Sequence, residues 1–241
     1  MLLAAVGASS AFAAPPLDFK EANSLYQSGK FKDAVKIYED LVKSGRKTEA
    51  VYFNLGNAYF RAGQKGKALI AYQRAIRIAP RDEDLKWNLR ILRSTLTDHV
   101  DRPSEDLALS LIKRVAARLR ADEIENLFSA LLLTFFAVHF FAWMFPQIKT
   151  LAGFLAGILS VCLIAAGIFF FIKWMDVKDP CAVVVEKEVS ARYGPSAKET
   201  KAFVLHEGAS GRVKDQTQDW VYIELENKST GWVPRASCEV V

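Results

Sequence analysis

The stretch NLFSALLLTFFAVHFFAWMF (residues 126–145), followed by PQIKT (146–150) and LAGFLAGILSVCLIAAGIFFFI (151–172), decides how this chain is organised. As an α-helix rising about 1.5 Å per residue, each apolar segment can cross a hydrocarbon core roughly 30 Å thick. The link between the segments is too short to recross a bilayer, so the second helix must return beside the first. We therefore predict two transmembrane helices, residues 126–145 and 151–172, with both flanking regions on one side of a membrane.

Length and composition limit the class of protein. The 241 residues carry a net charge of +5, and no basic tract is interleaved with aromatic residues, which argues against a nucleic-acid partner. Three cysteines and three histidines lie far apart without CxxC or HExxH spacing, so we expect no metal site and no cofactor. A nucleophile, a histidine and a carboxylate do not group together, and no phosphate-binding loop occurs, so we expect the protein not to be an enzyme.

The first residues form a short apolar run that ends in Ala11-Phe12-Ala13, which has the small-x-small form of a signal-peptidase site. We predict a cleaved signal peptide, residues 1–13. The basic residues that usually open such a peptide are missing from this run, so either the true start lies upstream of Met1 or the segment is a disordered alanine-rich leader.

Between Leu17 and Pro80 the sequence repeats itself with a period of 34 residues, and this period is typical of stacked helix pairs. The second copy resembles the tetratricopeptide repeat family, which implies an α-helical solenoid. Leucines at helical spacing predict one more helix from Asp82 to Thr97, so we expect a domain over residues 17–98 with two repeats and a capping helix. The residues that carry the resemblance are Tyr52, Leu55, Gly56, Tyr59, Ala68, Tyr72, Ala75 and Pro80.

The resemblance also implies a binding site, because such repeats generally hold extended peptides on the concave face lined by the first helix of each pair. Asparagine offers a donor and an acceptor to a partner's backbone, and aromatic rings add apolar contacts. In the alternative interpretation the rings pack against the adjacent helix and the asparagines only satisfy helix ends. The candidate partner-binding residues are Phe19, Asn23, Tyr26, Phe53, Asn54, Asn57, Phe60, Trp87 and Asn88.

Residues 104–121 predict a basic amphipathic helix next to the first membrane segment. Leu111, Val115 and Leu119 mark one face, and Arg114 and Arg118 lie largely outside it. The functional interpretation is a helix that lies on anionic lipid headgroups and orients the repeats. The alternative is a helix that packs on the last repeat with solvated cations.

After Pro180 the pattern changes to short alternating strands separated by turns, which indicates a small β-barrel. Residues 181–241 resemble the bacterial SH3-like family through Arg192-Tyr193-Gly194-Pro195-Ser196, Leu205-His206-Glu207-Gly208, Asp219-Trp220-Val221 and Gly231-Trp232-Val233. The fold class is thus a multidomain chain, α then β. Tyr193, Trp220 and Trp232 form a candidate ligand platform, although we expect at least one of the two tryptophans to lie in the core of so small a barrel.

Cys181 and Cys238 bracket the predicted barrel. The first and last strands of SH3-like folds approach each other, so the resemblance implies that the two thiols could meet. A disulfide closing a loop of that length would stabilise the fold by about 4 kcal/mol, and it would persist only in an oxidising compartment. Two ordinary buried thiols are the alternative.

Two signals for membrane orientation disagree. Cations flank the hairpin on its domain side, whereas its loop carries only Lys149, and the positive-inside rule would then keep both domains in the cytoplasm. The leader and the bracketing cysteines favour the opposite side. We predict a bacterial inner-membrane protein with two spans and both soluble domains in the periplasm.

The order of leader, repeats, hairpin and barrel resembles the BatE family of the Bacteroides aerotolerance group, whose relatives are encoded beside von Willebrand A-domain proteins and a MoxR-type ATPase. The resemblance implies a non-enzymatic scaffold of an envelope complex linked to stress tolerance, with von Willebrand A-domain membrane proteins as partners. The alternative function is binding or sensing of peptidoglycan through the SH3-like domain.

Overall fold

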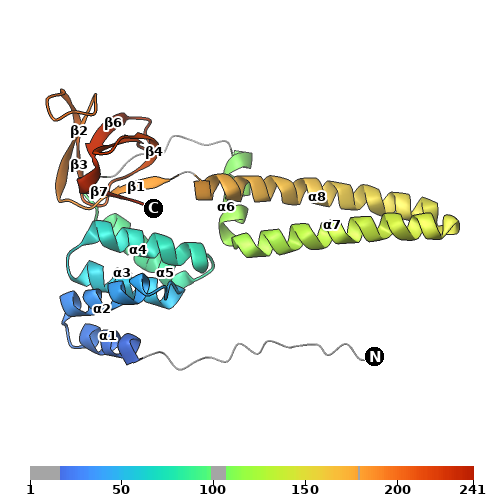
Figure 1. Ribbon diagram of the computed structural model, residues 1–241, viewed down its shortest axis with the longest axis horizontal. Helices are drawn as coiled ribbons and strands as arrows, with labels where there is room; N and C mark the ends of the chain where they lie inside the picture. The colour runs from blue at the N-terminus through green and yellow to red at the C-terminus, as the bar shows by residue number, and fades with distance from the viewer. Residues whose placement is uncertain (1–16, 99–106, 179) are drawn as a thin grey trace.

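The computed structural model describes residues 17–98, 107–178 and 180–241 (Figure 1). The predicted signal peptide, residues 1–13, lies outside the described residues, and so does the start of the predicted juxtamembrane helix, residues 104–106. We name three parts of the described chain the repeat domain (residues 17–98), the hairpin (121–178) and the sheet domain (180–241). Helix α6 (Leu107–Arg118) precedes the hairpin.

The repeat domain consists of five helices stacked as antiparallel neighbours (Figure 1). Gly29 and Gly63 follow the first helix of each pair with φ angles of 78° and 77°, which lie in the left-handed region that glycine adopts without a Cβ clash. The Asp82 carboxylate caps the last helix by accepting a 2.8 Å hydrogen bond from the Leu85 amide. The helices are α1 (Leu17–Gln27), α2 (Phe31–Lys43), α3 (Glu49–Arg61), α4 (Lys65–Ile78) and α5 (Glu83–Ser94).

The second helix pair packs through a glycine and a tyrosine. A Cβ atom on Gly56 in α3 would lie 2.5 Å from the ring of Tyr72 in α4, so only glycine lets the two helices approach this closely. Tyr72 and its counterpart in the first pair, Tyr38, are almost fully buried, as are Ala34 and Ala68. These residues alternate large and small volumes across the seam, as a well-packed core requires.

The hairpin projects away from the repeat domain and the sheet domain as two long helices (Figure 1). α7 (Ala121–Met144) and α8 (Lys149–Lys178) lie side by side and are joined by the short 3-10 helix η1 (Pro146–Ile148). Both helices are long and apolar enough to cross a membrane, judged by length and composition. They extend beyond the predicted segments 126–145 and 151–172, chiefly at the start of α7 and at the end of α8.

The sheet domain is a seven-stranded antiparallel sheet in the order β3-β2-β6-β5-β4-β1-β7. β3 and β7 form the two edges and do not pair with each other, so the predicted barrel is not closed by hydrogen bonds. β1, which pairs with β4 on one side and with β7 on the other, contacts α4 of the repeat domain. The strands are β1 (Cys181–Val184), β2 (Glu188–Arg192), β3 (Lys201–His206), β4 (Ser210–Gln216), β5 (Trp220–Glu224), β6 (Thr230–Pro234) and β7 (Cys238–Val240), with the 3-10 helix η2 (Arg235–Ser237) before β7.

The expectation that at least one tryptophan of the sheet domain lies in its core is wrong. Val221, Ile223 and Val233 fill the core, and strand alternation places Trp220 and Trp232 on the opposite face. Both tryptophans are half-buried on that outer face. The Trp232 ring lies 5.0 Å from the ring of Tyr222, which is its cross-strand neighbour.

The repeat domain and the sheet domain share an interface. Val183 of β1 is fully buried and belongs to the apolar core of the repeat domain. The Gly66 amide at the start of α4 donates a 2.9 Å hydrogen bond to the Glu207 carboxylate. Asp98, which follows α5, accepts hydrogen bonds from the backbone amide of His206 (2.6 Å) and from its ring Nδ1 (2.8 Å).

The predicted disulfide between Cys181 and Cys238 does not form in this structure, where both thiols are free. Cys181 pairs with Val241, and Cys238 pairs with Val184 on the same ladder. The cysteines are therefore three residues apart along the strands, about 10 Å, and their side chains point to opposite faces of the sheet. A disulfide requires Cα atoms within about 7 Å of each other. The periplasmic prediction thereby loses one of its two supports.

We expect all three cysteines to react with a maleimide in the denatured chain without any reductant. In the native chain Cys181 and Cys238 should react slowly at neutral pH, because burial raises the pKa of both thiols and only the thiolate is nucleophilic. Their rates should rise about tenfold per pH unit up to the raised pKa. Mass spectrometry of the labelled chain counts the adducts. If this pair were labelled only after reduction, the two cysteines would be joined by a disulfide and the prediction of free thiols would be wrong.

Candidate functional site

The groove residues predicted from the sequence come from α1, α3 and α5, the helices that occupy the same place in successive repeats. The sheet domain contacts α4, through the Gly66 amide and through an ion pair of 2.7 Å between Arg74 and Glu239. These two contacts are therefore made by a different helix from those that carry the groove residues. The sheet domain does not use α1, α3 or α5 for these contacts.

The four predicted asparagines form two equivalent hydrogen-bonded sets, 34 residues apart. In the first set the Asn23 carbonyl oxygen accepts from the Tyr38 hydroxyl (2.5 Å) and from the Asn54 amide (3.1 Å). In the second set the Asn57 carbonyl oxygen accepts from the Tyr72 hydroxyl (2.6 Å) and from the Asn88 amide (3.0 Å). We call these two sets the asparagine ladder. Each set ties three helices together, so the asparagines do more than satisfy helix ends.

The tyrosines of the ladder act as fixed donors. Burial raises the pKa of Tyr38 to about 12 and raises that of Tyr72 still further, so both hydroxyls keep their protons at physiological pH. Because each tyrosine must donate, the asparagine that faces it must present its oxygen. This sets the amide orientation of Asn23 and Asn57.

Each set of the ladder has unused hydrogen-bonding capacity. Among the described residues no partner is found for the side-chain NH₂ of Asn23 or Asn57, nor for the side-chain oxygen of Asn54 or Asn88. All four side chains are half-buried. Each repeat junction thus keeps an amide NH₂ and an amide oxygen without a partner among the described residues, and these are the groups that pair with a peptide backbone.

The predicted groove aromatics differ in how much surface they leave open. Phe19, Tyr26, Phe53 and Phe60 are half-buried and pack against the core of the repeat domain. Phe19 meets Tyr38 edge to face at 6.0 Å. These four rings therefore pack against the core, as the alternative interpretation expects. Only the part of each ring that stays exposed could contact a partner.

Trp87 is the exception, because 58% of its surface is exposed on α5. The Arg90 guanidinium lies 5.3 Å from the centre of its ring, a cation–π distance. Ile91, one helical turn further, is also exposed. The sequence reasoning missed Ile91, although it follows Asn57 by 34 residues and the repeat period could have identified it.

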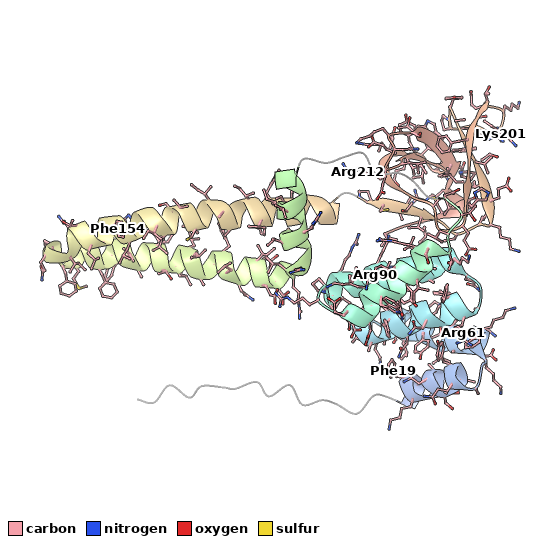
Figure 2. The ribbon with its side chains drawn as sticks, turned by 180° about the vertical axis from the view of Figure 1, so that it is seen from behind. Phe19, Arg61, Arg90, Phe154, Lys201 and Arg212 are labelled. Atoms are coloured by element: carbon pink, nitrogen blue, oxygen red, sulfur yellow. The ribbon has the colours of Figure 1, made fainter. Side chains whose placement is uncertain are left out.

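Figure 2 shows the side chains of the repeat domain, with Phe19 on α1 and Arg90 on α5 at opposite ends of the helix stack. The predicted partner-binding residues, which lie on α1, α3 and α5, are therefore spread along the stack. Its apolar exposed end lies at α5, because Trp87 and Ile91 are the two large apolar side chains of the repeat domain that are exposed among the described residues.

The three residues of the predicted ligand platform do not lie on one surface of the sheet domain. Trp220 and Trp232 lie on the outer face of β5 and β6, whereas Tyr193 is 71% exposed beside a cleft of about 780 Å³. β3 and the turn between β5 and β6 line the rest of this cleft, together with Thr97 and Asp98 of the repeat domain. Within the described ranges no group of three or more potential metal ligands is found.

The comparisons with known proteins match parts of the chain. Residues 19–83 match the family model of the tetratricopeptide repeat, which confirms the predicted repeats. Two solved structures of SycD, the type III secretion translocator chaperone of Yersinia enterocolitica, are similar to this chain, and one of them is a complex with a peptide of the translocator YopD. Each is 18% identical with a TM-score of 0.30 and covers 63% of this chain, and the shares of the SycD chains covered are 81% and 90%. No curated protein matches the sequence.

The chain therefore contains tetratricopeptide repeats, and it also carries two long apolar helices and an antiparallel sheet. Repeats of this class present surfaces for protein partners, since each repeat contacts only its neighbours and leaves an extended face open.

Proposed function

We propose that this protein is a non-enzymatic membrane-anchored adaptor whose repeat domain holds an extended segment of a protein partner. The observation that carries the proposal is the asparagine ladder with its unused donors and acceptors, next to the exposed Trp87 and Ile91. Paired amides bind a backbone without demanding a particular side chain, and an exposed tryptophan supplies the apolar anchor that dominates many interfaces.

The anchor in this proposal is the hairpin. Its large side chains face outward, among them Leu133, Phe154 and Val161, and hardly any residue of either apolar segment is buried. An apolar surface of this size is far larger than soluble monomers expose, so it requires a cover. A bilayer supplies that cover at the matching thickness, and the short η1 then keeps the repeat domain and the sheet domain on the same side.

The order of repeats, hairpin and sheet supports a more specific proposal, an adaptor of an inner-membrane complex of the BatE type with von Willebrand A-domain proteins as partners. In this proposal the two soluble domains face the periplasm. The orientation rests on the leader, because the free cysteines no longer argue for an oxidising compartment.

Peptidoglycan binding by the sheet domain is the second candidate. It is favoured by the exposed Tyr193 beside its cleft. We prefer the groove, because the tryptophans of the predicted platform lie on another face and are already half-covered. The groove instead combines a repeated polar motif with its most exposed aromatic side chain.

The groove is tested by replacing the two exposed apolar residues, Trp87→Ala with Ile91→Ala. Both side chains lie on the surface, so the fold should survive, and loss of a tryptophan anchor should weaken partner affinity by about 2 kcal/mol or more, roughly thirtyfold. Affinity purification from membranes, with quantitative mass spectrometry, measures which proteins are lost from the variant. Phe53 and Asn57 are unsuitable for this test because they also hold the helices together.

The matched control is Lys32→Ala with Lys36→Ala, two exposed side chains on α2. The control should keep every partner that the wild-type chain retains. Equal recovery of all partners by the groove variant and by the control would reject the groove as the binding site.

A further inference from the structure

Helix α6 carries apolar side chains on a surface that no described part of the protein covers. Leu111 and Val115 are each 50% exposed, and Ile112 is exposed as well. At 100° per residue these three side chains fall on one arc of the helix, with Ala116 at the edge of the arc. Ala116 is only 2% exposed, so α6 touches the rest of the protein at this edge and leaves the remainder of the apolar arc open.

The place of α6 in the fold distinguishes between the two interpretations of its amphipathic pattern. α6 contacts α8 and runs across the base of the hairpin rather than along it (Figure 1). Only Leu119 and Arg120 separate it from α7, the first apolar helix. The repeat domain does not cover the apolar arc, because Leu111 and Val115 would then be buried.

The charges of α6 border the apolar arc. Arg114 and Arg118 are exposed and lie one turn apart at the side of the arc that begins with Leu111. Long cationic side chains at such a border can keep their charged ends at the level of lipid phosphates while their stems cover apolar surface. An apolar arc bordered by cationic side chains is typical of a helix that lies in the membrane interface.

We propose that α6 lies in the plane of the membrane, with Leu111, Ile112 and Val115 among the acyl chains and Arg114 and Arg118 against anionic phospholipid headgroups. The proposal rests on the hairpin spanning the bilayer, as proposed above. The occupant of the open arc is lipid, because α6 adjoins the entry point of both apolar helices and its border charges complement anionic headgroups.

A consequence concerns the groove. Arg81, just before α5, makes two hydrogen bonds of 3.0 and 2.9 Å to the Glu123 carboxylate in the first turn of α7. With α6 lying on the lipid surface, this bidentate ion pair holds the α5 end of the repeat domain at the base of the hairpin. The end of the groove that carries Trp87 therefore stays close to the membrane, within reach of the juxtamembrane part of a partner.

The test places a nitroxide label on α6 of the full chain in lipid nanodiscs. Val115→Cys is labelled in a background with Cys162→Ala, Cys181→Ala and Cys238→Ala, and collision with oxygen and with a water-soluble nickel chelate is measured by electron paramagnetic resonance. Labels at Ile158 in α8 and Lys36 in α2 provide the lipid and the aqueous references. In mixed phosphatidylcholine and phosphatidylglycerol the label at Val115 should be open to oxygen and shielded from nickel, as at Ile158.

The contribution of the charges is measured with Arg114→Glu and Arg118→Glu in the labelled chain. Each reversal should weaken docking at least about fivefold in the anionic mixture, so that the nickel exposure of the label rises towards that at Lys36. The same reversal at Lys32 and Lys47, exposed cations of the repeat domain, is the matched control and should have no effect.

Three results would overturn the proposal. A label as open to nickel as Lys36 in both lipids places α6 in water. A label shielded from nickel and from oxygen shows that protein covers the helix. Unchanged shielding in phosphatidylcholine alone and in the charge-reversed chain removes the role of the arginines. A nickel-exposed label at Ile158 would instead reject insertion of the hairpin, so failure of the anchor is told apart from failure of α6.

Discussion

Replacing Gly66 by alanine should loosen the sheet domain from the repeat domain. A Cβ at this position would lie 2.4 Å from the carbonyl oxygen of Val184 and 3.1 Å from the Cα of Val185. Both are backbone atoms, and the Val184 oxygen is further held by a 2.9 Å hydrogen bond from the Gly208 amide. No side chain can rotate away to make room, so α4 and β1 must separate.

The size of the effect follows from two opposing contributions. Alanine in place of glycine favours a helix by about 1 kcal/mol, whereas overpacking of a tight contact costs about 1–3 kcal/mol. We expect the clash to dominate at the interface, because Val183 and the Gly66–Glu207 hydrogen bond both depend on the present spacing. The net cost is then at most about 2 kcal/mol, so hydrogen exchange of the full chain should become up to about thirtyfold faster in β1 and in the first turn of α4.

Gly194→Ala provides the control for the Gly66 prediction. Its nearest atoms, from 2.9 Å outward, belong to the exposed side chain of Glu199, which can rotate aside. Exchange in β1 and α4 should stay at the wild-type rate in this variant. Equal protection in the Gly66 and Gly194 variants would show that the interface does not depend on the close approach.

The second large effect is expected from Asn57→Ala in the asparagine ladder. The change removes the acceptor of the Tyr72 hydroxyl and of the Asn88 amide at once. An unpaired buried hydroxyl costs about 1–3 kcal/mol, and the second hydrogen bond contributes about 0.5–1.5 kcal/mol. We expect the free energy of unfolding of the second repeat to fall by about 2–4 kcal/mol, measured as hydrogen exchange in α3, α4 and α5.

A double-mutant cycle isolates the cause of the Asn57 effect. Tyr72→Phe removes only the hydroxyl, so adding it to Asn57→Ala should cost little further stability and give a coupling of about 1–2 kcal/mol. Gln27→Ala, on an exposed side chain of α1, is the control and should leave the exchange of α3 to α5 unchanged. Additive losses in the cycle would contradict the ladder.

The features that could be predicted are those with a local or periodic signal. The repeat period follows from contacts that each helix pair makes only with its neighbours, so residues such as Gly56 and Tyr72 recur in type at regular spacing. The apolar helices follow from composition alone. Asn23 and Asn57 were predicted together for the same reason, because they occupy equivalent positions in consecutive repeats.

The features that could not be predicted depend on contacts between distant parts of the chain. Residue types do not show that Cys181 pairs with Val241 rather than with Cys238, because a strand register is set by the turns and by the neighbouring strands. The outward placement of Trp220 and Trp232 depends on the same register. The hydrogen bonds that the oxygens of Asn23 and Asn57 accept could not be predicted either, because the donors Tyr38 and Tyr72 lie 15 residues further along the chain.

The repeat domain, the pair of apolar helices on a short link and the strand-rich end can all be recognised from residue order alone, because period, hydropathy and alternation are properties of neighbouring residues. How these parts meet depends on the folded structure. It placed Val183 in the repeat core and tied Arg81 to the start of α7. It also left α6 with an open apolar arc beside the hairpin. Such contacts arise from the shape and charge of folded surfaces, which no periodic pattern in the sequence records.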